Sequence, residues 1–141
     1  GWKVMIYYYS RLQGQSDKST SVYPLIPVLL IYKHQLIKTP IFGLVDSGAE
    51  YCYCHKIIGE YLRIKFRSKN KISSLAANGS QFIGYRETII SVINGKKIDM
   101  PLIFSDELNP SFRIILGQNS FFSQFKICFE KHQNTFSVDP V

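Results

Sequence analysis

The stretch IFGLVDSGA, residues 41–49, decides how the rest of the sequence is interpreted. Five mostly apolar residues carry the chain into a hydrophobic core, and the first polar residue that follows is the acid Asp46. An ionised carboxylate is costly there unless hydrogen bonds or a partner hold it. Ser47 offers a hydroxyl, while Gly48 and Ala49 leave space beside the carboxylate. Alone, the segment is more typical of a plain polar turn, because Asp, Ser and Gly are favoured turn residues.

The chain around this stretch consists of short β-rich runs separated by turn residues, a pattern typical of an all-β sandwich or barrel. Asn78-Gly79 and Asn94-Gly95 favour type I′ turns, which need positive φ at both central residues. The predicted strands are residues 3–9, 23–33, 41–45, 51–58, 71–77, 81–85, 87–93, 97–104, 112–116, 126–130 and 135–138.

Three local details accompany this pattern. Pro24 and Pro27 favour a sheet edge for the strand at 23–33, because proline cannot donate to a neighbouring strand. Residues 59–67 fit helix and strand equally well. Asn119 or Ser120 is expected to cap one short C-terminal helix that covers Phe121, Phe122 and Phe125.

Length and composition bound the domain organisation. The chain has 141 residues, of which 45% are hydrophobic and 14% aromatic, so it is a folded chain of one domain. Residues 1–21 form an N-terminal strand and polar loop, and residues 22–141 the main domain. The net charge is +7, and the densest basic patch comprises Lys65, Arg67, Lys69 and Lys71. We interpret these side chains as solvated and expect no nucleic-acid partner, because no nucleic-acid motif accompanies them.

The cysteines indicate free thiols. Cys52, Cys54 and Cys128 are odd in number, which argues against a disulfide framework and favours a reducing, cytoplasmic location. Cys52 and Cys54 alternate with tyrosines, as expected on the inward face of a strand. No spacing of ligands predicts a metal or another cofactor, and no stretch is long and apolar enough for a membrane span.

Three segments, taken in order, resemble the retropepsin-like aspartic proteases. That family has a hydrophobic pair before Asp-Thr/Ser-Gly-Ala, then a glycine-containing hairpin called the flap, then a hydrophobic pair with Gly and a short helix. The matching segments here are residues 44–49 (LVDSGA), 76–80 (AANGS) and 115–119 (ILGQN).

The resemblance implies a closed-barrel acid-protease fold with one short C-terminal helix, and an aspartic endopeptidase that acts on peptides or proteins as a homodimer. Asp46 of each chain would supply one of the two catalytic carboxylates, and Ser47 would hold the two loops together. The residues implied to contact the substrate are Gly48, Ala49, Glu50, Ala77, Asn78, Gly79 and Ser80.

One position departs from the family pattern. Gln118 stands where the family usually carries an arginine that is ion-paired near the active-site loop. An alternative interpretation is therefore a catalytically weak or inactive retropepsin-like domain that serves dimerisation or binding within a larger protein. A basic β module that binds nucleic acid is a further alternative.

Overall fold

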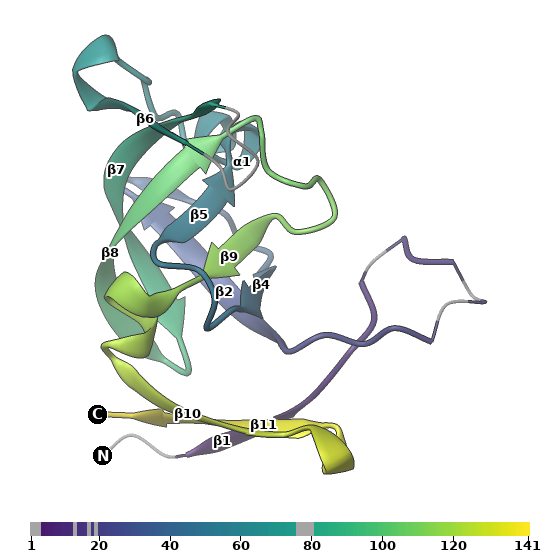
Figure 1. Ribbon diagram of the computed structural model, residues 1–141. Coiled ribbons are helices and arrows are strands. Elements are labelled where there is room, and N and C mark those ends of the chain that lie inside the picture. Colours follow the sequence, from purple (N-terminus) through teal and green to yellow (C-terminus); the bar gives the residue numbers. More distant parts are fainter. Residues whose placement is uncertain (1–3, 13, 17, 19, 76–80) are drawn as a thin grey trace.

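The structure is a computed structural model that describes residues 4–12, 14–16, 18, 20–75 and 81–141. Most of its regular structure is β-strand, as the alternating patterns predict (Figure 1). The elements in chain order are β1 (Met5–Tyr8), β2 (Leu25–Tyr32), β3 (Gln35–Leu36), β4 (Ile41–Val45), β5 (Cys52–His55), α1 (Lys56–Tyr61), η1 (Ser68–Asn70), β6 (Lys71–Leu75), β7 (Gln81–Ile93), β8 (Lys96–Ser105), β9 (Ile114–Leu116), η2 (Gln118–Phe122), β10 (Phe125–Glu130), η3 (Lys131–Gln133) and β11 (Thr135–Pro140).

The larger sheet closes into a barrel of six strands, which confirms the predicted all-β closed barrel. Its order is β3-β2-β4-β9-β5-β8-β7-β6, and β2 also pairs with β7, so the ring runs β2-β4-β9-β5-β8-β7 and returns to β2. The turn between β7 and β8 is the expected type: Asn94 has φ 52° and Gly95 has φ 74°. Local turn chemistry therefore sets the register of this long hairpin.

The neighbouring strands β4 and β9 are parallel, with Gly43 opposite Ile114 and Val45 opposite Leu116. Glycine at position 43 allows this close approach, because a Cβ there would lie 3.0 Å from Cδ1 of Leu116. The carboxyl ends of both strands consequently reach the same edge of the barrel, where Asp46 and Gly117 follow them.

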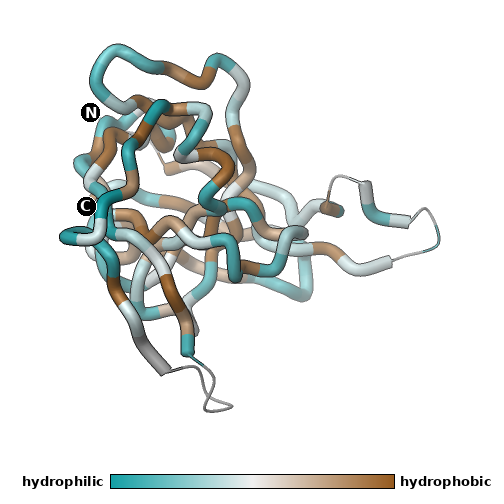
Figure 2. The backbone as a smooth tube through the Cα atoms, turned by 90° about the horizontal axis from the view of Figure 1, so that it is seen from above, coloured by the Kyte–Doolittle hydropathy of each residue, from teal (hydrophilic) through white to brown (hydrophobic). Residues whose placement is uncertain are grey.

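The core lies inside the barrel and beneath η2. Cys52 and Cys54 are buried, which confirms the predicted inward face of that strand. Figure 2 shows hydrophobic residues running through the central strands, while many peripheral turns are hydrophilic. The largest fully buried side chains are Phe104, Phe121, Phe125, Phe136, Ile26, Leu30, Leu62, Ile93, Met100, Leu102, Ile114 and Leu116.

A separate three-stranded sheet, in the order β1-β11-β10, joins the two ends of the chain and lies below the barrel in Figure 1. The Tyr7 hydroxyl donates a hydrogen bond to Oδ1 of Asn94, and Phe136 of this sheet is buried in the core. We call β1, β10 and β11 the terminal sheet.

Several sequence expectations were wrong. The strand predicted at 51–58 ends at His55, and α1 begins at Lys56. The strands predicted at 81–85 and 87–93 are one continuous strand, β7, which is long enough to border β6, β8 and β2. Residues 62–67, part of the ambiguous 59–67 segment, are irregular and follow α1.

The expected sheet edge at β2 was also wrong, because β2 lies between β4 and β7. Pro27 is tolerated since the residues that pair with β4 are 25–28, whereas pairing with β7 begins at Leu29. The predicted C-terminal helix is a single turn, η2, interrupted by non-helical backbone at Asn119 and Ser120; Phe125 instead begins β10.

Candidate active site

Backbone hydrogen bonds from both neighbouring segments hold the end of β4. The Val45 N–H donates to the Pro24 carbonyl at 2.9 Å, and the Asp46 N–H donates to the Leu116 carbonyl at 2.9 Å. The chain then turns sharply, since the Ala49 N–H donates to the Asp46 carbonyl at 3.2 Å. The barrel therefore fixes the point at which the Asp46 side chain emerges.

The Asp46 carboxylate is half-buried and is held by its own loop. Its Oδ1 accepts a hydrogen bond from the Gly48 N–H at 3.0 Å. A Cβ at position 48 would lie 3.3 Å from that same oxygen, so glycine keeps the carboxylate uncrowded. Within the described residues the only ion pair joins Lys56 to Asp106, at 3.8 Å. No basic side chain of the described chain therefore neutralises Asp46.

The segment after β9 supports the loop from below. The Gln118 N–H donates to the Ala49 carbonyl at 2.8 Å, and the Asn119 N–H donates to the Glu50 carbonyl at 2.9 Å. Only glycine fits at position 117, where this segment passes close to the backbone of Tyr51, because a Cβ there would lie 2.2 Å from the Tyr51 carbonyl oxygen. Residues 46–50 and 117–119 thus form one hydrogen-bonded unit, which we call the loop platform.

Gln118 is the residue at which the sequence departs from the family pattern, and the structure shows what its side chain does. Its Nε2 donates a hydrogen bond to the Ser47 backbone carbonyl at 2.8 Å. The amide therefore ties the base of the loop platform directly to the residue after Asp46. Sequence reasoning noted the missing arginine and missed this contact.

Cys52 is a second contributor that sequence reasoning treated only as a small hydrophobic residue. Its Sγ accepts a hydrogen bond from the Gly117 N–H at 3.3 Å, and its thiol lies 3.3 Å from the Asn119 carbonyl, which can accept from it. Burial raises the pKa of the Cys52 thiol to about 11, although hydrogen bonds with the backbone of Gly117 and Phe121 oppose the rise. Burial also raises the pKa of Cys54. Both cysteines are therefore neutral thiols, and Cys52 contacts the loop platform directly.

Two aromatic residues near the loop platform were also missed. Tyr23 directly precedes Pro24, whose carbonyl accepts the hydrogen bond from Val45. The ring of Phe112, in the loop before β9, packs edge to face on Tyr23 with 5.3 Å between centroids. Both side chains are half-buried. They place an apolar surface next to the strand end that carries Asp46.

The structure brings Asp46, Ser47, Gly48, Ala49 and Glu50 together in one loop. The other predicted substrate contacts, Ala77, Asn78, Gly79 and Ser80, lie outside the described residues, as does the tip of the predicted flap. The two strands that lead to this tip pair antiparallel, with Leu75 opposite Gln81.

Comparison with solved structures identifies the fold. The crystal structure of a retropepsin-like aspartic protease from Rickettsia conorii superposes with a TM-score of 0.65 and 18% sequence identity, covering 96% of this chain and 98% of that chain. The EIAV protease in complex with the inhibitor HBY-793 superposes with a TM-score of 0.53 and 17% identity, covering 77% of this chain and 92% of that chain. No protein-family model matches the sequence, and no curated protein matches it.

The chain therefore has a retropepsin-like fold, as the sequence pattern predicts. In the part of the chain that the structure describes, no helix has the length and apolar character needed to cross a bilayer.

Proposed function

We propose that this protein is an aspartic endopeptidase whose active site forms between two copies of the chain, each of which contributes Asp46. The observation that carries the proposal is the setting of that carboxylate. It is half-buried at the end of a barrel strand, held through Oδ1 by the Gly48 N–H at 3.0 Å, and approached by no described cation within ion-pair distance. A carboxylate set in this way is open to contact with a substrate and with a second carboxyl group.

Among the described residues, a single chain supplies only one carboxylate of this kind. Peptide hydrolysis by this chemistry needs two, because one must be ionised while the other is protonated, and close carboxylates reach that state by sharing a proton. Two-fold symmetry provides the second acid as Asp46 of a second copy.

In the proposed reaction, the ionised carboxylate takes a proton from a water molecule as the water oxygen attacks the carbonyl carbon of the substrate. The protonated carboxyl donates a hydrogen bond to the carbonyl oxygen and stabilises the charge that develops there. A proton is then transferred to the amide nitrogen, the C–N bond breaks, and a carboxylic acid and an amine are released. The two carboxyls end with one shared proton, as they began.

The terminal sheet is the surface that we assign to the dimer contact. β1 and β10 are both edge strands, so each has backbone groups available for a second chain. Exposed apolar side chains also gather here, and large apolar patches on a surface are typical of protein interfaces. The exposed large apolar residues of this region are Val4 (52%), Met5 (43%), Ile6 (69%), Tyr8 (75%), Phe129 (40%) and Val141 (74%).

The substrate in this proposal is an extended peptide that lies along the loop platform, with Gly48, Ala49 and Glu50 as backbone contacts. Tyr23 and Phe112 would form an apolar wall of the groove. The hairpin formed by β6 and β7, with Ala77, Asn78, Gly79 and Ser80 at its tip, would cover the peptide.

The decisive experiment compares Asp46→Asn with the intact protein in a peptide-cleavage assay on a mixed peptide library read by mass spectrometry. We expect the substitution to abolish cleavage and to leave the circular dichroism spectrum and the melting temperature nearly unchanged. Asp99→Asn is the matched control, since Asp99 is an exposed acid on β8. Unchanged cleavage by the Asp46→Asn variant would contradict the proposal.

A second candidate function is a binding or dimerisation domain without catalysis. The observation that favours it is Gln118 in the place of an arginine, because a neutral amide cannot form the ion pair that the family uses near the loop. Binding of a pepstatin-type inhibitor, measured at pH values from about 3 to 7, distinguishes the protease from the binding domain. A shared-proton dyad is expected to titrate in this range. A stable dimer that neither cleaves peptide nor binds the inhibitor would favour the binding domain.

A further inference from the structure

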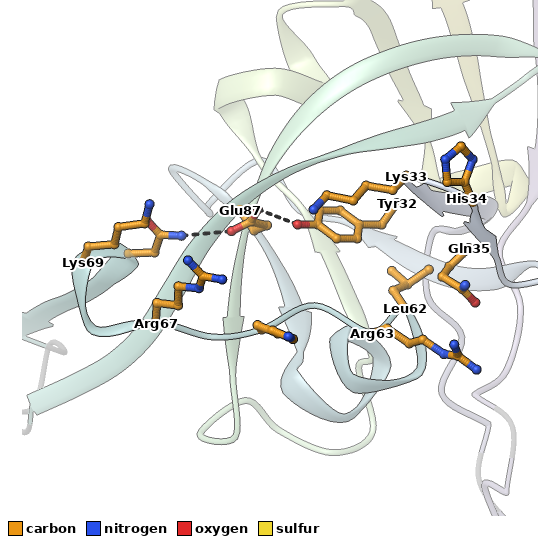
Figure 3. A pocket seen from close by; sticks show the side chains of 11 residues that line it. Tyr32, Lys33, His34, Gln35, Leu62, Arg63, Arg67, Lys69 and Glu87 are labelled. Carbon is orange, nitrogen blue, oxygen red and sulfur yellow. Dashed lines mark hydrogen bonds between the residues drawn. The ribbon is translucent and has the colours of Figure 1, made fainter.

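A basic pocket lies on the barrel at a distance from the loop platform. Its volume is about 480 Å³, and it is formed by the turn between β2 and β3, the segment between α1 and β6, and one residue of β7. Figure 3 shows Lys33 and Arg67 pointing toward Glu87 from opposite sides. Its five cationic side chains are Lys33, Arg63, Lys65, Arg67 and Lys69.

The segment after α1 is built so that its charges face outward. Leu62 and Ile64 are buried in the core, whereas the alternate residues Arg63, Lys65 and Arg67 are exposed. The apolar side chains anchor this segment to the core, and the cationic side chains between them project toward solvent. The basic patch noted in the sequence is therefore one wall of a pocket rather than a row of scattered surface charges.

The opposite wall holds a cation in a defined position. The Lys33 ammonium lies over the ring of Tyr32, 5.3 Å from its centroid, a cation–π contact. Lys33 and Arg63 also adopt left-handed backbone conformations, with φ of 53° and 60°. Such a conformation costs an ordinary residue about 1–2 kcal/mol, and glycine would avoid the cost. Charged side chains therefore occupy two positions where the backbone alone favours glycine.

The positive charge of the pocket is not compensated within the described chain. Glu87 is the only acid in the lining, and both its oxygens are engaged: Oε1 accepts from the Tyr32 hydroxyl at 3.1 Å and Oε2 from Nδ2 of Asn70 at 3.0 Å. The one ion pair among the described residues, Lys56–Asp106, lies outside this lining. A concave surface with so many cations and so few acids concentrates positive potential.

The pocket is far from Asp46. β2 and β4 are antiparallel, with Leu25 opposite Leu44 and Val28 opposite Ile41. Tyr32 therefore lies at the end of β2 opposite to Pro24, and the eight-residue separation spans roughly 26 Å along a strand. Figure 1 also shows the segment before β6 at the far end of the molecule from the terminal sheet.

We propose that this pocket binds a small ligand that carries two or more adjacent phosphate groups, such as a nucleoside polyphosphate or an inorganic polyphosphate. Arginine guanidinium groups bind phosphate through paired hydrogen bonds, and lysine adds a mobile point charge. The volume falls in the range of small-molecule sites, which runs from roughly 300 to 1,000 Å³. Apart from Leu62 and the ring of Tyr32, the lining is polar, so the pocket is unsuited to an apolar ligand.

The test is isothermal titration of the intact chain with inorganic tripolyphosphate, at low and at moderate salt. We expect saturable binding of one tripolyphosphate per chain that weakens as salt rises. The double variant Lys33→Ala/Arg67→Ala should lower the affinity by at least about tenfold, which corresponds to about 1.4 kcal/mol. Glu87→Gln should tighten binding several-fold, because it removes the only negative charge of the lining while one amide oxygen remains as an acceptor.

The matched control is the double variant Lys18→Ala/Lys97→Ala, which removes the same charge from two exposed lysines outside the pocket. If it weakens tripolyphosphate binding as much as the pocket variant, the binding reflects diffuse surface charge and the proposal is wrong. Absence of saturable binding at low salt would also overturn it. Binding of a single-stranded uridine oligonucleotide without binding of tripolyphosphate would assign the surface to nucleic acid instead. None of these readouts involves peptide cleavage, so they are independent of the proposed protease activity.

Discussion

The side chain of Gln118 donates a hydrogen bond from Nε2 to the backbone carbonyl of Ser47, with 2.8 Å between the two atoms. The bond joins residues 71 positions apart and connects the segment after β9 to the loop that carries Asp46. A neutral amide thus makes a direct contact with the loop that carries Asp46, at the position where retropepsin-like proteases usually have an arginine.

Gln118→Glu tests this contact with a side chain of nearly the same shape. The carboxylate cannot donate to the Ser47 carbonyl, so we expect peptide cleavage to fall by about tenfold. Because the bond is exposed, the free energy of unfolding should fall by less than about 1 kcal/mol. Gln118→Arg restores a donor and should retain cleavage. Equal activity of the glutamate variant and the intact chain would show that the contact does not position the loop.

Replacing each of two glycines in the loop platform by alanine should change the stability of the protein by different amounts. Gly117→Ala would place a Cβ 2.2 Å from the Tyr51 carbonyl oxygen and 2.6 Å from the Ala49 carbonyl oxygen, both backbone atoms. We expect a loss of more than about 3 kcal/mol in the free energy of unfolding, measured by urea denaturation.

Gly48→Ala is the companion variant, since its Cβ would meet only Oδ1 of Asp46, at 3.3 Å. Its unfolding free energy should stay within about 1 kcal/mol of that of the intact chain, while peptide cleavage falls. Similar stability of the two alanine variants would contradict the close packing at Gly117.

The three cysteines should differ in reactivity. Cys52 and Cys54 are buried and Cys128 is exposed, so one thiol should react rapidly with Ellman's reagent in the native state and two only after denaturation. Cys128→Ser should remove the fast phase. Rapid reaction of either remaining thiol in that variant would contradict the burial of Cys52 and Cys54.

Cys52 should also make the protein sensitive to alkaline pH. Burial raises its pKa from 9.0 to about 11, so the folded state keeps the proton after the unfolded chain has lost it. Its contribution to stability is fully present below pH 9 and is lost as the pH rises from 9 to about 11. The loss amounts to about 2–3 kcal/mol for this thiol, and Cys52→Ala should flatten that part of the pH profile of unfolding. If Cys52→Ala left the pH dependence of unfolding unchanged, deprotonation of Cys52 would be excluded as the cause of the alkaline loss of stability.

The proposed dimer contact can be tested at Ile6, which is 69% exposed on the edge strand β1. Ile6→Asp should shift sedimentation velocity toward the monomer and reduce cleavage in proportion, because a charge at an apolar interface is desolvated without a partner. The fold should be intact, since the side chain lies on the surface. Ile57→Asp, at a position 52% exposed on α1, is the control and should leave the association unchanged.

The features that the sequence alone determined are those that depend on a few neighbouring residues. The Asn94-Gly95 turn, the inward face of Cys52 and Cys54, and the strand that ends just before Asp46 were all predicted from local pattern. Each follows from backbone conformational preference or from the two-residue period of a strand, which act over only a few positions.

The tertiary structure decided which distant segments meet. The parallel pairing of β4 with β9, the position of β2 between β4 and β7, and the bond from Gln118 to Ser47 all depend on sheet register. The same closure gathers Lys33 and Arg67, far apart in sequence, around Glu87. No local pattern encodes these contacts, because the free energy that selects them comes from burying the shared core, and that core exists only when the barrel closes.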